Sequence, residues 1–302
     1  MTTEFVLYAQ HGWADDSRAI ATLAQAVAPT QAQIIAPDLG WVRTWLRIQP
    51  LIQQVEQVAI DTLSRYPDLP MKIIGHSMGG LIWLEVLHRH PEWWSQVEAL
   101  VLVASPVGGA DLARILDPFG IGIGIARDLG INRRAMAEAI AATIPTLIIA
   151  GDTDAGSDGT ITLESTKFNH AQFMRLPDLS HAVLKNHPAV ADAICNFWAH
   201  PDVPTPNLEA LDFKTQLIQR LQQIKGLTDA HQRDFRRSKV VIRFKNGLSL
   251  RTWRNPLQVA HIFVADPADR CLYAGFVGWV HTDDLHQALE EIKQRYDQEI
   301  LI

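Results

Sequence analysis

One serine of this sequence has the surroundings of an activated nucleophile. Ser77 is the centre of a G-x-S-x-G string, between a short apolar run at 71–74 and a longer one at 81–87. The first run is typical of a buried parallel strand, and the second of a helix packed on the sheet. The sharp turn between them needs Gly75 and Gly79, because Cβ atoms would clash there. The pattern predicts a serine hydroxyl held above the sheet, at the positive end of the helix.

A serine hydroxyl becomes nucleophilic when a base takes its proton and a carboxylate orients that base. We expect His181 to be the base, because it follows a strand-like run and lies on a loop just before a helix. His187 is the nearest alternative, but His187-Pro188 is typical of a helix start. His76, inside the serine string, more often packs against the fold than takes part in chemistry.

The carboxylate should follow the strand that ends near Gly151. Three aspartates lie on that loop, Asp152, Asp154 and Asp158. The residues alone leave the choice among them open, since an aspartate without a catalytic role would cap a turn there.

Acyl transfer also needs two N–H groups that stabilise a negatively charged oxygen. We expect one from Met78, directly after the nucleophile, and the other from Trp13, in the loop after the first strand. Gly12 permits a close approach of the backbone in that loop. The alternative interpretation of His11-Gly12 is an ordinary turn from a strand to a helix.

Strands and helices that would position these residues are predicted to alternate through the first 200 residues. Short apolar runs between amphipathic runs predict βαβ units, and so a doubly wound, mostly parallel sheet of about six strands. Ligands bind beyond the carboxyl ends of such strands, where Ser77 is expected. The predicted strands are 5–9, 34–37, 71–74, 99–104, 146–150 and 171–176, and the predicted helices are 17–27, 51–65, 79–89, 133–142 and 189–198.

The chain as a whole predicts two domains. Residues 1–200 form the expected α/β domain, with a lid-like insertion at about 105–143, for which a longer connecting helix is the alternative. A proline-containing linker at 201–207 leads to a small α+β domain at 208–302, with a first helix at about 208–224 and a terminal helix around 285–296.

Composition restricts the class of protein. The 302 residues are 47% hydrophobic and 20% charged, which is ordinary for a globular protein. Two cysteines and no run typical of a secretory signal or a membrane helix favour a cytoplasmic protein. The sequence has no H-E-x-x-H string and no paired-cysteine motif, so neither a metal nor an organic cofactor is implied.

The second domain contains a basic stretch at about 236–254, and Asn246-Gly247 within it predicts a hairpin. An odd loop with a bulge places apolar and basic side chains on opposite faces. The basic face would contact an anionic membrane or an acidic protein, with no nucleic acid expected, and a solvated face is the alternative. The expected apolar face holds Val240, Ile242, Phe244, Leu250 and Thr252, and the basic face Arg243, Lys245, Ser249, Arg251 and Trp253.

Together these motifs resemble the α/β-hydrolase superfamily over residues 1–200. The Gly-His-Ser-Met-Gly-Gly string is similar to the nucleophile turn of its esterases and lipases, and the order serine, acid, histidine is the order of that superfamily. An Asp-Gly pair before β-branched residues is similar to the acid loop of its lipase-like branch, which favours Asp158. The spacing from Gly151 keeps Asp154 as the alternative acid.

The first predicted strand already leads into His11-Gly12, so the chain resembles the minimal, small-lipase form of the superfamily. The resemblance implies a serine hydrolase that cleaves carboxylic esters of small molecules or lipids, without a cofactor or metal. A thioesterase, amidase or peptidase of the same fold is the alternative, and a non-catalytic binding protein is the alternative from another class. Residues 208–302 resemble no family.

Overall fold

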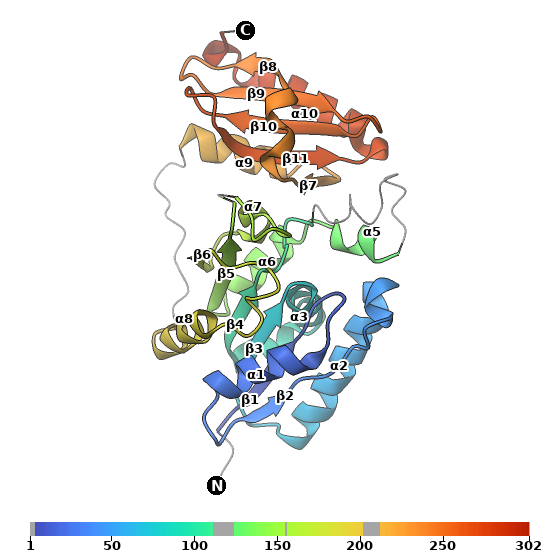
Figure 1. The fold of residues 1–302 in the computed structure, drawn as a ribbon, viewed down its shortest axis with the longest axis vertical. Coiled ribbons are helices and arrows are strands. Elements are labelled where there is room, and N and C mark those ends of the chain that lie inside the picture. The colour runs from blue at the N-terminus through green and yellow to red at the C-terminus, as the bar shows by residue number, and fades with distance from the viewer. Residues whose placement is uncertain (1–3, 111–123, 155, 202–211, 302) are drawn as a thin grey trace.

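The computed structural model describes residues 4–110, 124–154, 156–201 and 212–301. Figure 1 shows two β-sheets, one above the other along the long axis of the molecule. The first sheet has six strands in the order β2-β1-β3-β4-β5-β6, and all neighbouring strands are parallel. The predicted α/β fold class is therefore confirmed. The domain boundaries stay predictions, and most of the expected linker lies outside the described residues.

Every predicted strand and helix of the first domain is present, with ends that agree or differ by up to three residues. The strands are β1 (Val6–Gln10), β2 (Gln33–Ile35), β3 (Met71–His76), β4 (Val97–Val103), β5 (Thr146–Asp152) and β6 (Gln172–Pro177). The α-helices are α1 (Ser17–Val27), α2 (Ile48–Arg65), α3 (Met78–Arg89), α5 (Ile125–Leu129), α6 (Arg134–Ala141), α7 (Leu163–Thr166) and α8 (Pro188–Ala199). Two 3-10 helices are η1 (Arg43–Trp45) and η2 (Pro91–Gln96).

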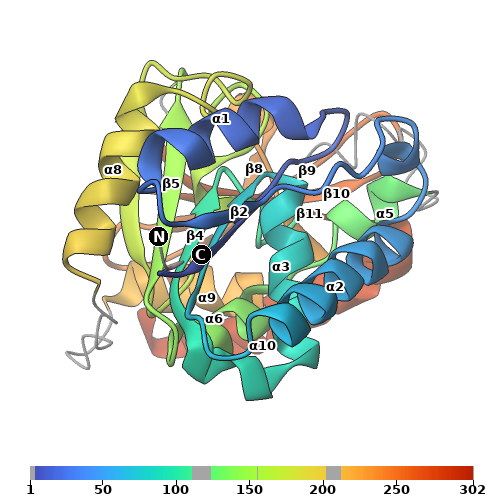
Figure 2. The same cartoon turned by 90° about the horizontal axis from the view of Figure 1, so that it is seen from below.

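Helices cover both faces of this sheet, because successive strand residues point to opposite sides. On β1, Leu7 belongs to the core beneath α1 and α8, whereas Val6 and Tyr8 belong to the core beneath α2 and α3. Figure 2 shows these two helix layers on opposite sides of the strands. Each layer therefore buries one apolar stripe of β1, β3 and β4.

The strand order reverses at β1, which has β2 on one side and β3 on the other. In parallel sheets, ligands bind beyond the carboxyl ends of the strands at such a reversal. Gln10, the last residue of β1, pairs with Gly75 near the end of β3. The loops that begin at His11 and Ser77 consequently leave the sheet side by side.

The second sheet has five antiparallel strands in the order β7-β11-β10-β9-β8. Two helices pack on one face, where Leu217 of α9 and Leu285 of α10 share a core with Ile262 of β10. The elements are α9 (Phe213–Gln222), β7 (Leu227–Asp229), β8 (Lys239–Arg243), β9 (Ser249–Arg254), β10 (Ala260–Ala265), β11 (Cys271–Val277) and α10 (Thr282–Arg295), with 3-10 helices η3 (Gln232–Arg237), η4 (Trp279–His281) and η5 (Asp297–Glu299).

The hairpin between β8 and β9 has the predicted odd loop. The N–H of Phe244 donates to the carbonyl oxygen of Leu248, and Gly247 between them has a φ of +86°. A register shift in β8 pairs Val240 with Arg251, on the basic face. Our placement of Val240 on the apolar face was therefore wrong, because the irregularity at Val241 reverses the alternation of side chains.

The basic face of this hairpin is partly covered. Phe235 of η3 is buried against Phe263, and the Arg251 guanidinium lies 4.9 Å from the centre of the Phe235 ring. Arg251 also forms an ion pair with Asp269, at 2.7 Å. A contact with an acidic partner stays a prediction for the part of the face that η3 leaves open, including Arg243.

The expected insertion at 105–143 is described in part. Residues 124–143 contain α5 and α6, and the α6 bounds agree with the helix predicted at 133–142. The glycine-rich segment at 111–123 lies outside the described residues. A lid over the site therefore stays a prediction.

Candidate active site

The backbone of Ser77 has the cramped conformation that the sequence predicts. Its φ is +55° and its ψ is −125°, between the end of β3 and the start of α3. A Cβ on residue 75 would lie 2.8 Å from the carbonyl carbon of Gly79. A Cβ on residue 79 would lie 2.7 Å from the carbonyl oxygen of His11, and closer still to that of Gln10. Both glycines are therefore required by close packing.

Replacement of Gly79 by alanine is expected to destabilise the protein by about 3 kcal/mol, because rigid backbone atoms occupy the space that the methyl group needs. Urea unfolding measures this change. Gly278 provides the matched control, since a Cβ there would meet no atom within 4 Å. Gly278→Ala should change stability by less than about 0.5 kcal/mol. Equal effects of the two substitutions would contradict the packing argument.

His181 lies between the serine and an aspartate. Its Nε2 is 3.0 Å from the Oγ of Ser77, and its Nδ1 is 2.7 Å from the Oδ2 of Asp158. A carboxylate accepts hydrogen bonds, so this network assigns the proton to Nδ1 and leaves the Nε2 lone pair facing the hydroxyl. The arrangement can take a proton from Ser77 and hold the resulting imidazolium next to a negative charge.

The structure separates the three aspartates of the acid loop. Asp158 is 2% exposed, and its Oδ1 accepts hydrogen bonds from the N–H groups of Thr160 and Ile161. Asp154 instead accepts from the N–H and the hydroxyl of Ser157. Asp152 also binds within the loop, through N–H groups at residues 154 and 156. Asp158 is thus the carboxylate that contacts His181, as the resemblance favours.

The rival histidines have other contacts. His187 caps α8, since its Nδ1 accepts from the N–H of Ala189. His76 is buried, and its Nε2 lies 3.1 Å from the carbonyl oxygen of His181. Burial and the positive charge that His181 can carry lower the pKa of His76 well below the ordinary histidine value. A neutral His76 can donate from Nε2 and so hold the backbone of His181, a contact that the sequence did not predict.

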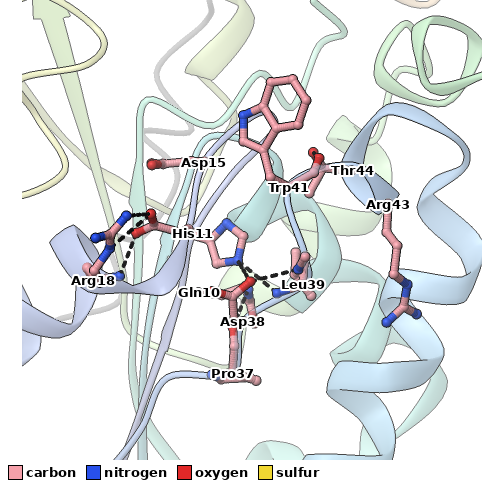
Figure 3. A network of polar contacts seen from close by, with 12 residues as sticks. Gln10, His11, Asp15, Arg18, Pro37, Asp38, Leu39, Trp41, Arg43 and Thr44 are labelled. Atoms are coloured by element: carbon pink, nitrogen blue, oxygen red, sulfur yellow. Dashed lines mark hydrogen bonds and ion pairs between the residues drawn. The ribbon is translucent and has the colours of Figure 1, made fainter.

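The ring of His11 links the loop after β1 to the loop after β2 (Figure 3). Its Nε2 accepts from the N–H of Leu39 at 2.9 Å, so its Nδ1 carries a proton and donates to the carbonyl oxygen of Gly12 at 3.0 Å. Burial lowers the pKa of His11, although Gly12 and the carboxylate of Asp38 act in the opposite direction. A neutral ring is what these two hydrogen bonds require.

The predicted oxyanion loop lies against the turn at Ser77. A Cβ on residue 12 would lie 2.8 Å from the Cβ of Ser77 and 3.3 Å from the nitrogen of Met78. Met78 begins α3, and Trp13 follows Gly12. The two expected N–H donors therefore belong to the segments that meet at Ser77.

Aromatic side chains pack beside this loop. The Trp45 ring lies 4.4 Å from that of Trp13 and 5.4 Å from that of Trp41, measured between centres. Trp41 is 54% exposed, and Leu46 is 62% exposed. We call residues 41–46 the aromatic rim. This rim was not predicted from the sequence, because a loop without regular periodicity gives no indication of what it packs against.

Within residues 4–110, 124–154, 156–201 and 212–301, no group of three or more histidine, cysteine, aspartate or glutamate side chains is placed to hold a metal ion. No helix within these ranges has the length and hydropathy needed to cross a membrane. A cavity of about 1240 Å³ lies between α6 and the second sheet, and Ser77, His181 and Asp158 do not line it.

A family model, Hydrolase_4, described as serine aminopeptidase S33, matches residues 3–120. This match includes His11 and Ser77 but ends before Asp158 and His181. No curated protein matches the sequence significantly.

Solved structures of α/β type are similar to part of the chain. The propeptide form of lipase BlEst2 from Bacillus licheniformis has a TM-score of 0.53 at 13% identity, over 67% of this chain and 52% of that one. The mature form of that lipase has a TM-score of 0.48 at 15% identity, over 65% and 92%. Est1E from Butyrivibrio proteoclasticus, with ferulic acid bound, has a TM-score of 0.49 at 15% identity, over 65% and 89%. At such identities the likeness concerns the fold, and the α/β-hydrolase fold predicted from the sequence is confirmed.

Proposed function

We propose that this protein of α/β-hydrolase fold is a serine hydrolase that cleaves carboxylic esters. The observation that carries the proposal is the position of His181, within hydrogen-bond distance of both Ser77 Oγ and Asp158 Oδ2. A nucleophile, a base and an orienting carboxylate in this order are the parts that acyl transfer requires. The family model matched by residues 3–120 supports a serine hydrolase as the class.

The reaction has two halves. Ser77 Oγ attacks the ester carbonyl carbon while Nε2 of His181 takes the hydroxyl proton, and the N–H groups of Met78 and Trp13 stabilise the oxyanion. The bond to the alcohol oxygen then breaks, and His181 returns the proton to that oxygen, which leaves an acyl group on Ser77. A water molecule that gives a proton to His181 attacks the acyl carbon. The acid leaves, and Ser77 regains its proton.

The surroundings of Ser77 support an ester with an apolar group. The Trp45 ring packs against that of Trp13 in the expected oxyanion loop, and Trp41 packs on Trp45. Trp41 and Leu46 of the aromatic rim are exposed enough to contact a substrate. Burial of such apolar surface against an acyl chain or an apolar alcohol makes the free energy of binding more favourable. Peptide cleavage, which the family description raises, is the second candidate.

A substrate panel tests the choice between these activities. We expect p-nitrophenyl esters with acyl chains of increasing length to be hydrolysed, with kcat/KM at least about a hundredfold above that for aminoacyl p-nitroanilides. Each methylene that contacts the rim should contribute up to about 0.8 kcal/mol to transition-state binding. A preference for the anilides would replace the esterase proposal with a peptidase.

A further inference from the structure

The second sheet contacts the loop that carries Asp158. Its edge strand β7 lies nearest the first domain, beside α7 (Figure 1). The chain continues from Asp229, the end of β7, through His231 to Gln232 at the start of η3. These residues belong to the domain without a predicted role, yet they meet both ends of the acid loop at 152–167.

His231 contacts the part of the acid loop before Asp158. Its Nδ1 accepts a hydrogen bond from the N–H of Arg233, so its Nε2 carries the proton. Nε2 donates to the Oδ2 of Asp154 at 3.0 Å. The same carboxylate accepts from the N–H and the hydroxyl of Ser157, at 2.7 and 2.8 Å. His231 therefore binds the Asp154 carboxylate, whose hydrogen bonds hold residues 154–157 in their conformation immediately before Asp158.

The titration of Asp154 reflects these contacts. Partial burial acts to raise its pKa, but the hydrogen bonds from Ser157 and His231 outweigh burial and lower it. Asp154 consequently stays ionised at neutral pH. Gln232 adds a packing contact, since a Cβ on residue 156 would lie 3.3 Å from its Nε2.

Asp229 acts at the other end of the acid loop through Arg134 of α6. The Arg134 guanidinium donates to the carbonyl oxygens of Glu164 and Lys167, at 2.8 and 3.0 Å. Asp229 forms a buried ion pair with that guanidinium and accepts from the Tyr273 hydroxyl at 2.6 Å. The Asp229 carboxylate supplies the negative charge that a buried arginine requires. It therefore stabilises the Arg134 guanidinium, which binds the carbonyl oxygens at the end of α7.

We propose that the second domain is a positioning module for the acid loop, and that His231 is its positioning residue. The module holds the loop at Asp154 and at the end of α7, and Asp158 lies between these two points. A loop fixed at both ends keeps the carboxylate of Asp158 in the place where it orients His181. The catalytic consequence rests on the proposed function, whereas the effect on the loop does not.

Steady-state kinetics on p-nitrophenyl butyrate test the catalytic consequence in the full-length protein. We expect His231→Ala to lower kcat by about tenfold with little change in KM, because a displacement of about 1 Å at a catalytic group costs up to about a hundredfold. His231→Gln should restore most of kcat, since its amide can donate to Asp154. His286→Ala, on α10, is the matched control and should behave as wild type. A wild-type kcat for His231→Ala would overturn the proposal.

Hydrogen exchange tests the loop independently of activity. Backbone N–H groups of residues 153, 157, 158, 160 and 161 are hydrogen-bonded within the loop, and they should exchange faster in His231→Ala than in wild type. Unchanged exchange would overturn the proposal. Faster exchange together with a wild-type protein that cleaves no ester would support the module and reject only the hydrolase function.

Discussion

Replacement of Ser77 by alanine is expected to lower ester turnover by at least about 10⁴-fold, because the attacking oxygen is removed and no covalent step remains. Alanine is the right substitution, since it keeps the Cβ and removes only the hydroxyl oxygen at a residue whose φ is +55°. Glycine would also relieve the strain of that positive φ, and so would change stability as well as the chemistry. Initial rates on p-nitrophenyl esters measure the loss, and circular dichroism verifies the fold.

A fluorophosphonate probe provides a second measurement for this variant. The probe should label the wild-type protein on Ser77 and leave Ser77→Ala unlabelled. Ser64→Ala is the matched control, because Ser64 lies on an exposed face of α2 and its hydroxyl donates to the carbonyl oxygen of Ile60, one turn earlier in the same helix. Continued labelling of Ser77→Ala would show that another residue is the nucleophile.

Asp158→Asn should lower kcat by about 10⁴-fold while the protein keeps its fold. The retained amide oxygen can still accept from the N–H groups of Thr160 and Ile161, so the loop geometry survives. The new NH2 group would face Nδ1 of His181, which can then only accept. The ring proton moves to Nε2, and the lone pair that should take the Ser77 proton is lost. Single-turnover kinetics would place the loss in the acylation step.

Asp154→Asn is the control for this prediction. Asp154 contacts Ser157 and His231 rather than His181, so its loss should cost much less than the loss of Asp158. A larger effect at position 154 than at position 158 would assign the catalytic carboxylate to Asp154. Such a result would require the loop in solution to differ from the structure.

The first sheet and the nucleophile turn could be predicted because local signals agree there. Apolar runs that alternate with amphipathic ones are compatible with few topologies. The glycines around Ser77 indicate a sharp turn at which a Cβ would clash. All six predicted strands are present in the sheet. The structure also brings Ser77 and His181 together, although 104 positions separate them.

Other parts of the site depend on packing that no local pattern encodes. Asp152, Asp154 and Asp158 all accept hydrogen bonds from nearby N–H groups, and only the tertiary fold decides which carboxylate meets His181. The bulge that moves Val240 to the basic face is likewise set by pairing with β9. No sequence pattern indicated the contact of His231 with Asp154, because the two residues are 77 positions apart.

The contacts of Arg134 and Asp154 with the second sheet have a consequence for how the protein is made. Ribosomes release the chain from its amino terminus, and domains fold in that order. The first sheet and its serine turn are complete in sequence before Asp229 and His231 have been synthesised. Until then Arg134 has no carboxylate from β7 beside it, and the acid loop lacks one of its supports. Under the proposed role of the second domain, a nascent chain therefore lacks these supports of the acid loop until β7 and η3 have been synthesised and folded.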